Sequence, residues 1–113
     1  MIKILGYDTA VKYSPTLEDG GSEKVGRWLS AKQTIILDPN CCQQAQESTL
    51  LHEIIEALDY YLELELDHRV ITSLEAGLYS VLTDNGVDLS VLLEDKSKGV
   101  MIGRNLEDAL RGE

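Results

Sequence analysis

The feature that most constrains the fold is a stretch from Cys41 to about Leu66 that contains neither glycine nor proline. Its apolar side chains recur every three or four residues: Leu50, Leu51, Ile54, Ile55, Leu58, Tyr61 and Leu62. Because that spacing gathers them on one side of an α-helix, we predict one long amphipathic helix here, or two helices with a break near Ser48. Asn40, which follows Pro39, suits the N-cap position.

A second helix is predicted from His68 to Asp84. Asp67 can cap its N-terminus, and Asn85-Gly86 is a stop signal. One side of this helix carries the apolar residues Val70, Ile71, Leu74, Leu78, Val81 and Leu82. Since few residues separate the two helices, we expect them to form an antiparallel pair. Residues 89–93 are predicted to form a short helical turn.

The first forty residues have the composition of β-strands. Ile2 to Tyr13 and Lys32 to Asp38 are rich in β-branched and aromatic residues, and a proline follows each stretch. Asp19-Gly20-Gly21-Ser22 lies between them and predicts a turn. The expected fold class is therefore α+β, with a small antiparallel N-terminal β-sheet packed on the long helix and its antiparallel partner. Trp28 is expected to anchor the core on the sheet side.

The length and charge of the chain limit its number of domains and its possible partners. A chain of 113 residues can build one domain, which we place at residues 1–95, with 96–113 as a C-terminal tail. Twenty acidic and 10 basic residues give a net charge of -10, which argues against nucleic acid as a partner. No apolar run reaches the roughly 18 residues that span a bilayer, and the start lacks a signal-peptide pattern. We therefore expect no membrane partner and a cytoplasmic location, with the adjacent Cys41 and Cys42 reduced.

The chemically informative residues of the long helix are His52, Glu53 and Glu56, in the sequence H-E-I-I-E. His52 and Glu56 lie about 40° apart on one face, with their Cβ atoms about 6 Å apart, so both can bind one metal ion. Glu53 is next to His52, at the position where a zinc hydrolase places the carboxylate that takes a proton from the attacking water. The spacing therefore predicts a metal site with a catalytic base.

This helix resembles the active-site helix of the zincin metallopeptidases, which carries H-E-x-x-H, and in particular that of small phage and prophage proteins of the ImmA/IrrE-like kind. The resemblance covers roughly residues 33–85, from the strand QTIILD through STLLHEIIEAL to HRVITSLEAGLYSVLTDN. In that family a strand precedes the active-site helix and a later helix supplies the third metal ligand. The resemblance implies a minimal zincin-like core and a zinc-dependent peptidase.

The chain departs from the family at Glu56, which replaces the second histidine of the motif. The only other histidine, His68, stands at the head of the second helix, near where the resemblance places the third ligand. His52, Glu56 and His68 together restore a set of two imidazoles and one carboxylate. Glu75, seven residues further along the same helix face, is the alternative third ligand. We favour His68 and expect Glu75 to orient an imidazole from outside the ligand set.

The expected activity is hydrolysis of a peptide bond in a peptide or protein substrate, with Glu53 as the general base and Zn²⁺ as the cofactor. Two imidazoles and a carboxylate also suit iron, manganese or nickel. The resemblance implies that QTIILD is an edge strand that binds an extended peptide, and a homo-oligomer could supply further walls. Tyr60 and Tyr79 are candidates for stabilising an oxyanion.

Two alternatives account for the same residues. One is a catalytically inactive zincin-like module that binds metal or a protein partner. The other is an acidic helix face that is solvated, or that pairs with a basic protein, and binds no metal. Elemental analysis for bound metal separates this second alternative from the first one and from the peptidase.

Overall fold

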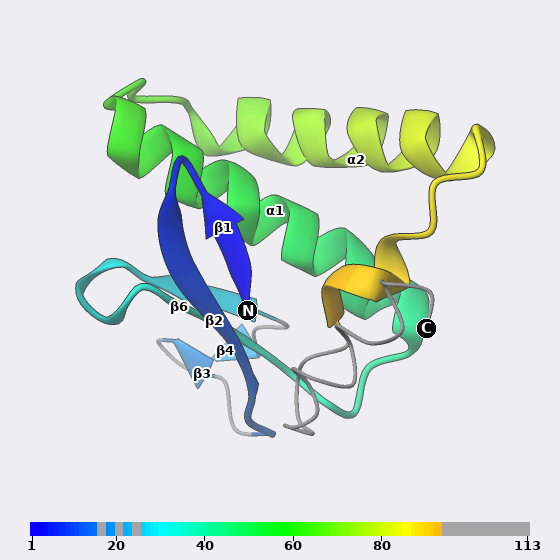
Figure 1. The fold of residues 1–113 in the computed structure, drawn as a ribbon, viewed down its shortest axis with the longest axis horizontal. Helices are drawn as coiled ribbons and strands as arrows, with labels where there is room; N and C mark the ends of the chain where they lie inside the picture. Colours follow the sequence, from blue (N-terminus) through cyan, green and yellow to red (C-terminus); the bar gives the residue numbers. More distant parts are fainter. Residues whose placement is uncertain (16–17, 20–21, 24–25, 94–113) are drawn as a thin grey trace.

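The computed structural model describes residues 1–15, 18–19, 22–23 and 26–93, with the side chains of 1–15 and 26–93. The fold is α+β, as expected: a small N-terminal sheet is followed by a long helix and a partner helix (Figure 1). In chain order the elements are β1 (Ile2–Ile4), β2 (Tyr7–Tyr13), β3 (Glu18–Asp19), β4 (Ser22–Glu23), β5 (Gly26–Leu29), η1 (Ser30–Lys32), β6 (Thr34–Leu37), α1 (Gln43–Leu62), α2 (His68–Asp84) and η2 (Leu89–Leu93). The predicted tail at 96–113 lies outside the described residues.

Four strands form a mixed sheet in the order β1-β2-β6-β5. The pairs β1–β2 and β5–β6 are antiparallel, as predicted, whereas β2 and β6 run parallel. The parallel pair arises because the chain after β2 forms the antiparallel pair β3–β4 and then β5 before it turns back into β6. β6 is thus hydrogen-bonded on both sides. The prediction that QTIILD forms an edge strand is wrong, and the edge strand at this side of the sheet is β5.

The core lies between one face of the sheet and α1. The register aligns Val11 with Ile35 and Ile35 with Trp28, so these side chains share the face that α1 covers. The buried apolar cluster consists of Ile4, Val11, Ile35, Leu37, Leu50, Ala57 and Leu93. Trp28 is partly buried against this cluster, which confirms its predicted role as an anchor on the sheet side.

α1 is one unbroken helix, Gln43–Leu62, inside the predicted stretch. It does not begin directly after Asn40, because the N–H of Asn40 donates to Asp38 Oδ1 at 2.9 Å in a turn that precedes the helix. It ends before the predicted Leu66 because Glu63 adopts a left-handed conformation with φ 53°. The N–H of Glu63 then donates back to the carbonyl oxygen of Asp59, so this carbonyl group in the last turn of the helix has a hydrogen-bond donor.

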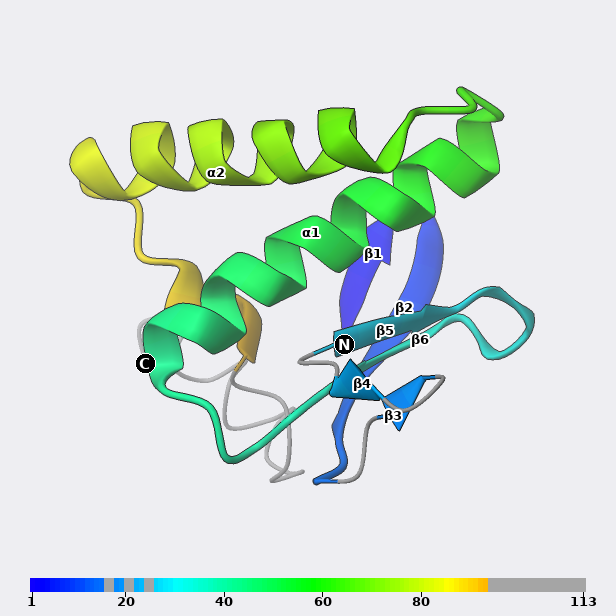
Figure 2. The same ribbon diagram turned by 180° about the vertical axis from the view of Figure 1, so that it is seen from behind.

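α2, His68–Asp84, has the predicted bounds and N-cap. Asp67 Oδ1 accepts a hydrogen bond from the N–H of Arg69 at 3.1 Å, and Gly86 follows the helix with φ 85°. α2 lies on the side of α1 that faces away from the sheet (Figures 1 and 2). Of its predicted apolar stripe only Ile71 is buried, because α1 is the described element against which α2 mainly packs. Neither described α-helix combines the length and apolarity that crossing a membrane requires.

Gly26, the first residue of β5, allows this strand to pack closely against α1. A Cβ at this position would clash with Thr49 Cγ2 and would lie 3.2 Å from Leu37 Cδ2. We expect Gly26→Ala to lower the free energy of unfolding by about 1–3 kcal/mol, because overpacking forces the strand and the helix apart. Urea unfolding followed by far-UV circular dichroism measures this change.

The matched control is Gly77→Ala, because an added Cβ on this α2 residue meets nothing within 4 Å. Helix propensity predicts that this control gains up to about 1 kcal/mol of stability. Adding Thr49→Ser to Gly26→Ala removes the clashing methyl group and should recover most of the loss. A Gly26→Ala chain as stable as the parent would contradict the close packing of β5 on α1.

Candidate metal site

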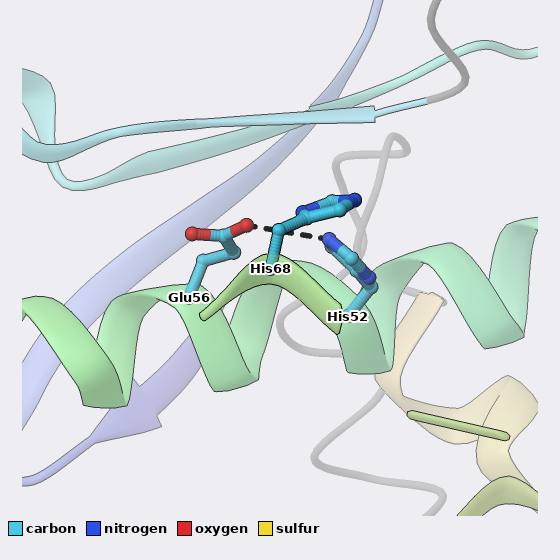
Figure 3. A group of neighbouring side chains, drawn as sticks. All are labelled: His52, Glu56 and His68. Atoms are coloured by element: carbon cyan, nitrogen blue, oxygen red, sulfur yellow. Dashed lines mark ion pairs between the residues drawn. The ribbon is translucent and has the colours of Figure 1, made fainter. Parts of the chain in front are cut away.

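Three of the predicted site residues, His52, Glu56 and His68, meet where α2 begins (Figure 3). His52 and Glu56 project from the same face of α1, as their four-residue spacing predicts. His68 is the first residue of α2, and its ring centroid lies 5.4 Å from that of His52. One donor atom from each of the three side chains lies within 4.8 Å of the others. The structure therefore brings the predicted ligand set together.

The spacing of the donor atoms of His52 and Glu56 suits a small ion. His52 Nε2 lies 3.3 Å from Glu56 Oε2, whereas a charge-assisted hydrogen bond would be about 2.7–2.9 Å. Two ligands that each lie about 2.05 Å from a tetrahedral zinc ion are about 3.3–3.4 Å apart. The largest separation in the group, at most 4.8 Å, would have to shrink by about 1.5 Å for the same geometry. His68 can make that adjustment because it is exposed and begins a helix.

Glu75 contacts the opposite edge of the His52 ring. Its Oε1 lies 2.8 Å from His52 Nδ1, and its Oε2 accepts a hydrogen bond from the hydroxyl of Ser48. A carboxylate at Nδ1 favours the tautomer that carries its proton there, which leaves the lone pair of Nε2 directed at Glu56. Glu75 thus lies where a carboxylate that orients an imidazole from outside the ligand set is expected.

Glu53, the predicted base, is 8% exposed and lies on the wall of a cleft between β5 and α1. The cleft has a volume of about 230 Å³ and is lined by Gly26, Arg27, Trp28, His52, Glu53, Glu56 and His68. Glu53 thus shares one cleft with the candidate ligands. The cleft is smaller than the roughly 300–1,000 Å³ of pockets that enclose a small molecule, so it can hold only part of a larger ligand.

The two tyrosines considered for an oxyanion lie outside the cleft lining. The hydroxyl of Tyr79 donates to Glu47 Oε1 at 3.1 Å, and Gln43 Nε2 donates to Glu47 Oε2 at 2.7 Å. Burial, together with the hydrogen bond to Glu47, raises the pKa of the Tyr79 phenol, so this group remains a protonated donor. Tyr79 is thus engaged with Glu47, and the ring of Tyr60 packs edge-on against Trp28.

The strand side of the cleft was not predicted. Gly26, Arg27 and Trp28 belong to β5 and have no spacing relation to the H-E-I-I-E segment, so no local pattern could connect them to the site. Ser48, which lies one turn before His52 on α1 and donates to Glu75, was not predicted either. A search for hydroxyl residues at i-4 from a candidate ligand would have found it.

No protein-family model, curated protein or solved structure matches this chain.

Proposed function

We propose that the chain is a zinc-dependent metallopeptidase of the zincin-like kind, with His52, Glu56 and His68 as the zinc ligands. The observation that carries the proposal is the convergence of these three donors within 4.8 Å, from two helices. Two imidazoles and one carboxylate form the ligand set of many catalytic zinc sites and leave a fourth position for water or substrate. The carboxylate of Glu75 on His52 Nδ1 supports the same proposal, since metal-binding histidines commonly donate their other N–H to such a group.

Glu53 is the proposed general base. When bound, a zinc ion lowers the pKa of a water toward about 7 and polarises the scissile carbonyl group. The Glu53 carboxylate accepts a proton from the water whose oxygen attacks the carbonyl carbon, and it returns the proton to the leaving amine as the C–N bond breaks. Its place on the wall of the same cleft as His52 and Glu56 supports this role.

The proposed substrate is an extended peptide that pairs with β5. This strand lies at the edge of the sheet, and three of its residues line the cleft that contains Glu53 and Glu56. Backbone pairing with an edge strand holds a peptide without requiring a deep pocket, which suits a cleft of about 230 Å³.

The experiment is incubation of the zinc-loaded chain with a mixture of peptides in water enriched in ¹⁸O. We expect cleavage products that carry one ¹⁸O atom in the new carboxyl group, with activity that is lost on chelation and restored by zinc. A chain that binds one zinc but cleaves nothing would favour the catalytically inactive zincin-like module instead.

Replacement of Glu75 by leucine is expected to weaken zinc binding by about 10–100-fold, because the His52 imidazole loses the acceptor that orients it. Glu75→Gln should lose less affinity, since its amide oxygen can still accept from Nδ1–H. Competitive titration against a chromophoric chelator measures the affinities, and thermal unfolding of the metal-free chains checks that both variants are folded. Equal zinc affinity in Glu75→Leu and the parent would show that this contact does not act on the metal site.

A further inference from the structure

Four of the chain's six aromatic residues form one connected cluster beside the cleft. The ring of Trp28 lies edge-on to Tyr60 and to Tyr61, with centroid distances of 6.4 Å and 5.9 Å. Tyr7 stacks on Tyr61 at 4.4 Å. Trp28 is the one member that also lines the cleft, so the aromatic cluster and the candidate metal site share a wall.

Core packing does not explain the whole cluster. Trp28 and Tyr61 are partly buried against the core, but Tyr60 is 56% exposed and Tyr7 is 47% exposed. Tyr60 follows Glu56 by one turn of α1 and therefore lies on the same side of that helix, about 6 Å further along. The cluster thus forms an exposed aromatic surface beside β5. This surface begins near Glu56, the proposed metal ligand, and continues toward the C-terminal end of α1.

Two buried polar atoms in this cluster have no hydrogen-bond partner within the described part of the chain: Trp28 Nε1 and the hydroxyl of Tyr61. Such atoms reduce stability, and a purely apolar side chain would pack at either position without that cost. Trp28 and Tyr61 are therefore not the side chains that packing alone would select at these two positions.

We propose that the wall formed by Trp28 and Tyr60 binds a large apolar side chain, aromatic above all, of the peptide substrate. The inference rests on the proposed function for the location of the peptide, which pairs with β5 so that alternate side chains face the cleft. An aromatic side chain gains from the area that it buries and from ring contacts, whereas a cation on an exposed ring must give up part of its hydration. An acidic side chain is disfavoured by Glu53 and Glu56, which line the cleft together with Trp28.

The test measures binding without turnover, with the zinc-loaded Glu53→Gln chain. Four capped hexapeptides of glycine and serine carry phenylalanine, alanine, lysine or glutamate at one central position. Dissociation constants come from isothermal titration calorimetry. The emission of Trp28, the only tryptophan, reports whether each peptide reaches the cleft. We expect the phenylalanine peptide to bind at least tenfold more tightly than the alanine peptide and to change the Trp28 emission.

Variants of Tyr60 locate the preference. Tyr60→Ala should reduce the preference for phenylalanine over alanine to about threefold or less, and Tyr60→Phe should preserve it. Val81→Ala is the matched control, because Val81 is 58% exposed but lies toward the far end of α2 from His68, and it should preserve the preference too.

The outcomes separate this inference from the proposed function. A phenylalanine preference that depends on Tyr60, in a parent chain that cleaves no peptide, would support the binding wall and refute the peptidase. Cleavage of peptides with no phenylalanine preference, or a preference for lysine, would refute the binding wall and leave the peptidase standing. An unchanged preference in Tyr60→Ala would also overturn the inference.

Discussion

Zinc-loaded Glu53→Gln is expected to hydrolyse a given peptide about 10²–10⁴-fold more slowly than the parent chain, which is the usual contribution of a general base. Glutamine has nearly the shape of glutamate, so it should keep the packing of a side chain that is only 8% exposed while losing the proton acceptor. The measurement is kcat on one peptide at saturating concentration, with the zinc content of both chains determined in the same preparations.

The control for this prediction is Glu63→Gln, which removes an exposed carboxylate from the end of α1 and should leave kcat unchanged. Zinc content should be the same in all three chains, because Glu53 lies outside the proposed ligand set. A Glu53→Gln chain with the parent's kcat would assign the proton transfer to another group.

His52→Ala is expected to abolish zinc-dependent stabilisation, because His52 lies between Glu56 and Glu75 and contacts both. Zinc at 100 times its Kd stabilises a folded chain by about 2.7 kcal/mol, which in a domain of this size raises Tm by about 10–20 °C. Thermal unfolding with and without zinc measures the rise, which we expect in the parent chain and not in the variant.

Asp84→Asn is the control, because it removes a carboxylate that could bind zinc elsewhere: Asp84 ends α2 at the opposite end from His68. It should keep the full rise in Tm. Because Glu75 loses its contact with the His52 ring in His52→Ala and keeps the hydrogen bond from Ser48, the metal-free Tm of each chain is the reference for its own shift. A rise of equal size in His52→Ala would place the zinc at some other site.

The helices were predictable because their signals are local. The spacing of apolar residues defined α1, and Asp67 and Gly86 marked the ends of α2 with side-chain and backbone chemistry that acts over a few residues. The pairing of His52 with Glu56 was predictable for the same reason, since four residues make one helical turn. The α+β class followed from the order of strand and helix signals.

The sheet topology was not predictable in full because strand order depends on contacts between distant segments. QTIILD reads as a strand, but only the placement of β5 beside it makes β6 an interior strand. The start of α1 was not predictable because two local structures compete for Asn40. Asn40 forms a turn with Asp38 and therefore does not cap the helix. The strand side of the cleft was not predictable because it requires Gly26, which lets β5 lie close to α1. A glycine in the sequence does not indicate which element packs against it.

The central claim is that His52, Glu56 and His68 form the ligand set, and zinc content per chain tests it most directly. The chain, its His68→Ala variant and its Glu75→Ala variant are purified without chelator or affinity-tag metal, saturated with zinc, desalted and analysed for zinc and protein. We predict one zinc per chain in the parent and in Glu75→Ala, and a loss of stoichiometric zinc in His68→Ala. One zinc per chain in His68→Ala, with loss in Glu75→Ala, would contradict the account and make Glu75 the third ligand.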